Sequence, residues 1–383
     1  MIKLLSHLSH IEIYALDVEE SVRFYEEQIG LRVIDRQGEK VYLRAWGDYY
    51  RYSVVITPGT ESGMVSMAWR TTSGEALDEA VRRIEEAGYA GQWLEPGAGL
   101  GRSYLFTGPY GHTMQLFWEV EKYKAEGEFA STYPDRPEKR SQHGVAPRQL
   151  DHVTIASNDV VGFAEWYRDV LGFRIMAYAQ LDGTDLTFFG VTTTNEKSHD
   201  LGILLDSSDR PGRIHHYAFW VDTREDLLRT ADLLLENGTP MEYGPGLHGI
   251  GEQSFLYFRD KSGLRIEVNT GGYRNYVPDW EPNVWSPLEG CDDFYRNVTL
   301  PRTMLEASPP SDKPTATEQG VIPGTEEDLL AMAAMHPQHS NEYEAGRQAR
   351  PPGLATGSCT LSPHPTTMAA GRKMPGPYPS PPG

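Results

Sequence analysis

The chain has 383 residues, enough for two domains with a sizeable core in each. Its formal net charge is −19, which argues against nucleic acid and anionic membrane surfaces as partners. The two cysteines, Cys291 and Cys359, provide no disulfide framework and no cysteine-rich zinc cluster, so a bound metal would need histidine and carboxylate ligands. The N-terminus lacks a signal-peptide core and the sequence has no long apolar run, which predicts a cytoplasmic protein.

The most informative feature is an internal repeat with an offset of 142 residues. Residues 8–34 read LSHIEIYALDVEESVRFYEEQIGLRVI, and residues 150–176 read LDHVTIASNDVVGFAEWYRDVLGFRIM. The pattern in each copy predicts a strand in which apolar and polar residues alternate, followed by a helix with an aromatic pair on one face. The helix is expected to end at Gly30 in the first copy and at Gly172 in the second, because glycine adopts the left-handed conformation that ends many helices.

The second half of each copy aligns as well. FTGPYGHTMQLF at 106–117 matches FRDKSGLRIEVN at 258–269 with an offset of 152, so the later copy carries extra residues in its middle. Each copy therefore has the order β-α-β-β-β, used twice, and the predicted fold class is α+β. We predict one domain of tandem βαβββ modules at 1–142, a second at 144–287, and a C-terminal extension at 288–306.

The composition changes near residue 307. The segment 307–383 contains 14 of the 27 prolines and few large apolar residues. Such a segment cannot bury enough surface to offset the entropy lost on ordering. We predict a disordered, inert tail, with one short helix at Glu326–Met335.

Three residues of the second copy, His152, His216 and Glu267, form the best candidate for a metal site. Nonheme Fe(II) oxygenases hold the metal with two neutral imidazoles and one carboxylate, which leaves neighbouring positions open for substrate and oxygen. Three strands of one cup-shaped sheet can direct three side chains to one point. A carboxylate in the apolar strand LRIEVN would also be unfavourable unless it were paired or bound to a metal.

The first copy serves as an internal control for this site. A single strand histidine is usually a hydrogen-bonded structural residue, so the triad needs independent support. The repeat aligns His10, Ser66 and Gln115 with the three candidates, and this is a poor set for Fe(II). A complete triad therefore occurs in the second copy alone.

Two adjacent histidines occur in the strand HHYAFWV. Alternation places His216 and Trp220 on one face of the strand, and His215 and Tyr217 on the other. Only one of the two histidines is therefore expected to enter the cup. The pattern alone leaves open which of them does so.

Several stretches together resemble one enzyme family: LDHVTIASND, KSHDLGILL, GRIHHYAFWVDTREDLLRTADLL, YGPGLHGIG and FLYFRDKSGLRIEVNTGG. They are similar to the type I extradiol dioxygenases of the vicinal oxygen chelate superfamily, the catechol 2,3-dioxygenases among them. The resemblance covers about residues 7–300 and excludes the tail. It implies His152, His216 and Glu267 as the metal ligands, and it places His215 outside the ligand set.

The resemblance also implies three residues that handle protons and substrate. His199 is expected to act first as a base toward the catechol and later as an acid toward oxygen. His248, in a glycine-rich loop, is expected to form a hydrogen bond with a substrate oxygen, and Tyr257 is expected to contact the deprotonated substrate oxygen. The first copy has Leu105 at the position of Tyr257 and no histidine that matches His248, so these residues are missing where the triad is missing.

The implied activity is Fe(II)-dependent extradiol cleavage of a catechol by O2 to a 2-hydroxymuconic semialdehyde, in a homo-oligomer. Mn(II) accepts the same ligand set, so the sequence leaves the metal open, as it does the ring substituents. The alternatives are a 4-hydroxyphenylpyruvate-type dioxygenase, which shares a His-His-Glu triad, and a non-enzymatic binding protein of the same superfamily. A glyoxalase-type lyase would usually draw metal ligands from two modules, and the first copy lacks them.

Overall fold

The computed structural model describes residues 3–206, 208, 210–286, 290–293, 295 and 301–311, all of them within one compact unit, Met1–His336. The predicted tail beyond residue 311, with the helix predicted at Glu326–Met335, lies outside the described residues. Within the described ranges, no helix has the length and apolar character needed to cross a membrane.

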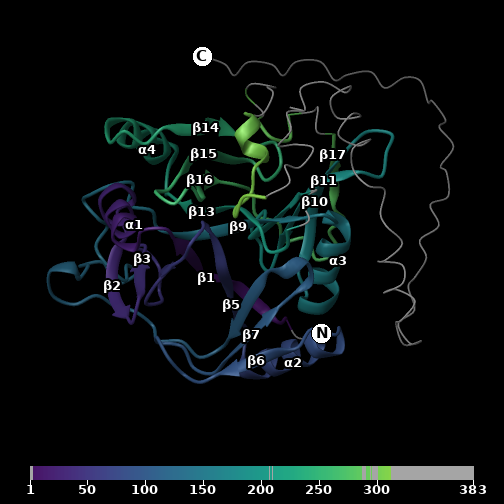
Figure 1. Ribbon diagram of the computed structural model, residues 1–383, viewed down its shortest axis with the longest axis horizontal. Helices are drawn as coiled ribbons and strands as arrows, with labels where there is room; N and C mark the ends of the chain where they lie inside the picture. The colour runs from purple at the N-terminus through teal and green to yellow at the C-terminus, as the bar shows by residue number, and fades with distance from the viewer. Residues whose placement is uncertain are drawn as a thin grey trace, which may run out of the picture. The chain divides into compact units, whose positions relative to one another are not determined.

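The first half of the chain forms one sheet, coloured purple to blue in Figure 1. Its strands are β1 (Leu5–Ala15), β2 (Arg32–Gln37), β3 (Lys40–Arg44), β4 (Val54–Pro58), β5 (Gly63–Thr71), β6 (Gly91–Leu94), β7 (Ser103–Thr107) and β8 (Thr113–Phe117). They lie in the order β2-β3-β4-β1-β5-β8-β7-β6. Helix α1 (Val18–Phe24), continued by a π turn at Tyr25–Ile29, follows β1, and helix α2 (Gly74–Glu86) follows β5. The chain order is thus βαβββ twice.

The second half, coloured teal and green in Figure 1, repeats this arrangement. Its strands are β9 (Gln149–Ser157), β10 (Arg174–Gln180), β11 (Thr187–Thr193), β12 (Leu201–Leu205), β13 (Ile214–Trp220), β14 (Met241–Leu247), β15 (Gln253–Arg259), β16 (Arg265–Gly271) and β17 (Asn283–Trp285). Their order is β14-β15-β16-β13-β9-β12-β11-β10-β17, with α3 (Val160–Leu171) after β9 and α4 (Arg224–Glu236) after β13. The predicted α+β fold of tandem βαβββ modules is confirmed. The exact domain limits, 1–142 and 144–287, stay a prediction.

The first helix of each half begins and ends in the same way. The side chain of Asp17 accepts a hydrogen bond from the main chain of Glu20, and that of Asp159 accepts one from Gly162, so each caps its helix. Gly30 and Gly172, at φ +78° and +76°, end the two helical segments as predicted.

The two halves share one apolar core, and each first helix reaches across to the other half. The hydroxyl of Tyr25, just after α1, donates to Asp260 at 2.8 Å and is hydrogen-bonded to Tyr217. The equivalent Tyr167 of α3 donates to the sulfur of Met114 at 3.4 Å. These contacts fix the second sheet, which carries the predicted triad, against the first.

Two β-bulges interrupt the pairing of β9 with β13. Ile214 pairs with Ile155 and His216 pairs with Thr154, so His215 is an extra residue on β13. On β9, Asp151 is extra in the same way, between Leu150 and His152. A bulge redirects side chains that strict alternation would place on opposite faces.

The first sheet has both bulges at the equivalent positions. Ser9 is an extra residue of β1, Val65 is an extra residue of β5, and a further shift occurs at Ser6 of β1. The bulged backbone is therefore common to both halves, whatever residues occupy it.

A C-terminal segment, residues 301–311, lies against the second sheet, and we call it the C-terminal strap. It contains a short 3₁₀ helix, η4 (Arg302–Leu305). Ser308 exchanges two main-chain hydrogen bonds with Ile214, both of 2.7 Å. Residues 307–311, which the sequence assigned to the disordered tail, are thus paired with the sheet, and the limit of the tail stays a prediction. The prediction considered apolar side chains, whereas this segment is held through its main chain.

Candidate metal centre

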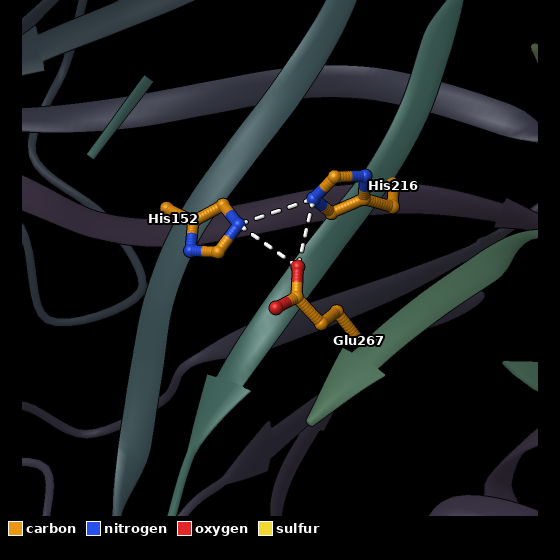
Figure 2. A group of neighbouring side chains, drawn as sticks. All are labelled: His152, His216 and Glu267. Carbon is orange, nitrogen blue, oxygen red and sulfur yellow. Dashed lines mark hydrogen bonds and ion pairs between the residues drawn. The ribbon is translucent and has the colours of Figure 1, made fainter. Parts of the chain in front are cut away.

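Three adjacent strands bring His152, His216 and Glu267 together, as Figure 2 shows. His152 comes from β9, His216 from the central β13 and Glu267 from β16. The Nε2 atoms of the two histidines lie 3.1 Å apart, and Glu267 Oε2 lies 3.1 Å from each of them. All three side chains are buried, so the structure brings together the complete triad predicted from the sequence.

The size of this triangle can be compared with the requirements of a metal ion. For metal–ligand bonds of about 2.1 Å, ligands at right angles on one face of an octahedron lie about 3.0 Å apart, whereas tetrahedral ligands lie about 3.4 Å apart. The three observed edges of 3.1 Å therefore match a facial set better than a tetrahedral one. A facial set leaves the opposite side of the ion open.

The far side of His152 is held by a carboxylate. Its Nδ1 lies 2.9 Å from Oδ2 of Asp151, which can only accept, so Nδ1 carries the proton and donates it. Lys197 binds the other oxygen of Asp151 at 2.7 Å, and Asn269 donates to Oδ2 at 3.0 Å. Burial opposes ionisation of Asp151, but Lys197 and then His152 outweigh it and lower its pKa. In a neutral His152, Nε2 then has a free lone pair.

The far side of His216 is held by His215. The main-chain oxygen of Met304 lies 2.7 Å from Nε2 of His215, and a carbonyl oxygen only accepts, so this nitrogen carries the proton. Burial, then Arg265, lowers the pKa of His215 well below its usual value, so the ring is neutral and its Nδ1 is an acceptor. That Nδ1 lies 2.6 Å from Nδ1 of His216, which must donate to it. The Nε2 atom of His216 therefore also has a free lone pair.

Three potential metal-donor atoms, two imidazole nitrogens and one carboxylate oxygen, thus face one point. Within the described residues, neither oxygen of Glu267 has a hydrogen-bond donor in acceptable geometry, although both are buried. Burial opposes its ionisation, but the two imidazoles, His152 first, outweigh this and hold the pKa of Glu267 well below its usual range. Burial also opposes charge on His152, yet Glu267 and Asp151 raise the pKa of His152 to about 9, so without a metal the ring holds a proton that a bound cation would displace. The position therefore attracts a cation, and its donor set of two imidazoles and one carboxylate fits a divalent transition metal.

His199 lies beside the triad, as predicted. It lies two residues before β12 and is buried, and the centroid of its ring lies 4.3 Å from that of His152. Burial, then the charge of His152, lowers the pKa of His199 well below its usual value, so its ring is neutral. A neutral imidazole at this place can accept a proton from a group bound at the centre.

His248 and Tyr257 also lie at the site and are bonded to each other. Nδ1 of His248 donates to the main-chain oxygen of Asp292, so its Nε2 accepts a hydrogen bond of 3.0 Å from the hydroxyl of Tyr257. The Tyr257 ring centroid lies 5.2 Å from that of His216. Burial, then the charge of Glu267, raises the pKa of Tyr257 well above its usual value, so it remains a hydroxyl.

Strand alternation did not predict the neighbours of the triad correctly. It places His215 and His216 on opposite faces, but the bulge at His215 brings their rings into contact, with centroids 4.9 Å apart. Sequence reasoning also missed Asp151, since alternation would direct it away from His152. The signal that could have found it is the adjacent pair Asp-His itself, because a bulge lets neighbouring residues meet.

Comparison with known proteins places this geometry in a family. The family model of the Glyoxalase/Bleomycin resistance protein/Dioxygenase superfamily matches residues 7–116 and 149–268. These two matches cover more than half of the chain and fall on the two halves of the repeat. The chain therefore belongs to this superfamily.

The similar proteins are dioxygenases. The chain is 35% identical to the manganese-dependent 2,3-dihydroxybiphenyl 1,2-dioxygenase of Geobacillus genomosp. 3, over 74% of this chain and 91% of that protein. It is 32% identical to the metapyrocatechase of Geobacillus stearothermophilus, over 77% and 91% of the two chains. Within the superfamily, the chain is an extradiol dioxygenase.

The solved structures support the fold. The homoprotocatechuate 2,3-dioxygenase of Arthrobacter globiformis superimposes with a TM-score of 0.69 at 24% identity, over 80% of this chain and 92% of that chain. The doubled pair of βαβββ modules is therefore the architecture of this enzyme as well.

Proposed function

We propose that the enzyme cleaves the ring of a catechol beside its two hydroxyls, using O2 and an Fe(II) ion held by His152, His216 and Glu267. The product of unsubstituted catechol would be a 2-hydroxymuconic semialdehyde. The observation that carries this proposal is the triangle of three donor atoms, Nε2 of His152, Nε2 of His216 and Oε2 of Glu267, with edges of 3.1 Å. A bound divalent metal would hold both catechol oxygens and O2 on its open side and carry their negative charge.

His199 is the residue we propose for proton transfer. Binding of a catechol as its monoanion releases a proton, and the neutral ring of His199, next to His152, can accept it. The same ring can later return this proton to oxygen during cleavage of the O–O bond. A low pKa makes the charged form of His199 a ready donor for that second step.

His248 and Tyr257 are proposed to orient the substrate. In the structure, the hydroxyl of Tyr257 donates to Nε2 of His248. A catechol oxygen that entered between them could accept from Tyr257 and, as a hydroxyl, donate to His248. Both residues are therefore suited to fix one substrate oxygen, and the high pKa of Tyr257 keeps it a donor toward an anionic oxygen.

The test is direct. Purified enzyme is loaded anaerobically with Fe(II), exposed to O2 and mixed in turn with catechol, 2,3-dihydroxybiphenyl and 4-hydroxyphenylpyruvate. We expect the yellow absorbance of a ring-fission product with a catechol only. The variant His216→Ala should bind no stoichiometric iron and form no product. Full activity and iron content in that variant would falsify the ligand assignment, and consumption of the oxo acid alone would point to the other dioxygenase type.

Mn(II) is the second candidate metal. It accepts the same ligands, and the relative at 35% identity is named for its dependence on manganese. Enzyme loaded with each metal alone, under equal conditions and with bound metal measured, separates the two. Activity per bound metal ion that is higher with Mn(II) would replace iron in the proposal.

We also propose that the enzyme is a cytoplasmic homo-oligomer. The sequence contains only two cysteines, which suits a reducing compartment. The oligomer rests on the family resemblance. Light scattering during size-exclusion chromatography gives the particle mass, and a mass of one chain would contradict this part of the proposal.

A further inference from the structure

The C-terminal strap joins the second sheet at the start of β13. Strand β16 pairs with β13 only from Tyr217 onward, so the main chain of Ile214 is left for another partner. Ser308 of the strap takes that place through its two main-chain hydrogen bonds. The strap therefore lies next to His215 and His216.

Two buried arginines fix the strap from the side of the sheet. Arg265 donates to the main-chain oxygens of Thr303 and Glu306, at 2.5 and 2.9 Å, and also to that of His215 at 2.9 Å. Arg213 donates to the main-chain oxygens of Ala307 and Pro309, at 2.8 and 2.9 Å. Both arginines are 1% exposed. Charge-assisted hydrogen bonds of this kind are strong and directional, so the position of each strap carbonyl is well defined.

One strap carbonyl reaches the candidate metal centre through His215. The oxygen of Met304 accepts from Nε2 of His215, and Nδ1 of His215 then accepts from Nδ1 of His216. The chain of hydrogen bonds runs in one direction, because a carbonyl oxygen cannot donate. It ends with Nε2 of His216 free of a proton and directed at the centre.

We propose that the C-terminal strap supports the metal centre. The Met304 carbonyl, acting through His215, sets the tautomer and orientation in which His216 binds the metal. His215 is thus a positioning residue. This inference rests on the proposed function, since it assumes that His216 is a metal ligand.

Loss of this relay, the hydrogen-bond chain from His216 through His215 to the Met304 carbonyl, is expected to weaken metal binding. Without His215 as an acceptor, the ring of His216 can adopt the other tautomer, whose Nε2–H cannot bind a metal, and it can also rotate. Removal of such a supporting partner typically lowers metal affinity by about 10- to 100-fold. The effect is on binding of the metal, whereas a residue that only fills space would affect folding.

The experiment compares two buried histidines in the full-length chain. His215→Phe removes the relay. His10→Phe is the matched control, because His10 is also buried and is hydrogen-bonded to its neighbour, Ser9, but belongs to the first sheet. Each protein is titrated with Mn(II), with free ion followed by electron paramagnetic resonance, and its thermal unfolding is recorded. We expect both variants to unfold at lower temperature, and only His215→Phe to bind Mn(II) about 10- to 100-fold more weakly.

A conservative variant sharpens this test. His215→Asn retains an amide oxygen that can accept from His216, but loses the bond to Met304. Its affinity for Mn(II) should therefore lie between those of the wild type and His215→Phe. If the phenylalanine variant does not fold, the asparagine variant carries the test alone, with a weaker affinity than the wild type as the expected result.

The outcomes are distinct. If the wild type binds neither Mn(II) nor Fe(II), the proposed function fails. If the wild type binds the metal and a folded His215 variant binds it within about twofold of the same affinity, the inference about the strap is overturned. An equal loss of affinity in His10→Phe would also overturn it, since the effect would then follow from general destabilisation.

Discussion

Strands β1 and β9 each contain a bulged residue followed by a buried histidine: Ser9 and His10 in the first sheet, Asp151 and His152 in the second. Next to each histidine lies an alanine of the neighbouring strand, and beyond that alanine lies Gln115 in the first sheet and Glu267 in the second. The backbone registers of the two halves are therefore the same at the site.

The two histidines differ because their neighbours differ. Burial alone lowers the pKa of His10 to about 3, with a small opposing effect of Gln115. At the equivalent place, Glu267 and Asp151 outweigh burial and raise the pKa of His152 to about 9. The same backbone arrangement thus holds a neutral histidine, His10, in the first half and a cluster that attracts a cation in the second half. The fold positions the site, and a few side chains decide whether it can bind a metal.

The largest effect is expected when the second half is made to resemble the first. Glu267→Gln removes the carboxylate and leaves two neutral donors, so the variant should lose stoichiometric metal. Since a catalytic metal contributes several kcal/mol to transition-state stabilisation, ring-cleavage activity should fall by about 1000-fold or more. Metal analysis and product absorbance measure both effects.

The reverse change, Gln115→Glu, is the matched control. It places a carboxylate beside His10, so the pKa of His10 should rise from about 3, as nuclear magnetic resonance can measure. The metal content should remain one ion per chain, because Ser66 provides no imidazole. A second tightly bound ion would show that two donors suffice in this frame, so that a complete triad is not required for metal binding.

The next largest effect concerns proton transfer. His199 lies over His152 where Tyr52 lies over His10, with ring centroids 4.3 and 4.7 Å apart. His199→Phe keeps the ring but removes the proton acceptor, and general acid–base catalysis typically contributes about 100- to 10,000-fold. We expect kcat to fall by about 100-fold or more with metal content unchanged. Tyr52→Phe should leave kcat unchanged, and an equal loss in both variants would contradict a role specific to His199.

A smaller effect is expected at the bulge of β9. Asp151→Asn keeps an acceptor for Nδ1 of His152 but removes the negative charge, so the imidazole becomes a weaker ligand. Affinity for Mn(II) should fall by about 10-fold, the lower end of what supporting partners contribute. Ser9→Ala, the same position in the first half, should not change it. A titration with unchanged affinity in the Asp151 variant would mean that the hydrogen bond alone, without the charge, supports the site.

The equivalent positions of the two halves show what the sequence could and could not predict. The repeat aligned Ser66 and Gln115 with His216 and Glu267, and the observed registers confirm it. The bulges at Asp151 and His215 were not predictable, because strict alternation has no place for an extra residue. The end of the C-terminal strap, 307–311, was assigned to the tail for another reason. Its main-chain carbonyls accept from Arg213, and such carbonyls occur in every sequence, so composition gives no signal of them.

The smallest expected effects concern the equivalent tyrosines that join the halves. Tyr25 donates to the carboxylate of Asp260, whereas Tyr167 donates to the weakly accepting sulfur of Met114. Hydrogen bonds to charged groups contribute about 1.5–3 kcal/mol, so Tyr25→Phe should lower the free energy of unfolding by about 2 kcal/mol. Tyr167→Phe should lower it by less than about 1 kcal/mol. Urea denaturation near neutral pH measures both.

The pH dependence of the effects of Tyr25→Phe and Tyr167→Phe tests whether the carboxylate of Asp260 causes the difference between them. Burial raises the pKa of Asp260 from 3.8 to about 6, partly offset by Tyr25. Between these values the folded protein binds more protons at Asp260 than the unfolded chain does, so this carboxyl makes stability fall as pH rises toward 6 and adds no slope above it. Tyr25 stabilises the ionised form, and its removal should therefore cost more above about pH 7 than below about pH 5. Tyr167→Phe should cost the same at both. Equal pH dependence in the two variants would mean that Asp260 is not what distinguishes the two contacts.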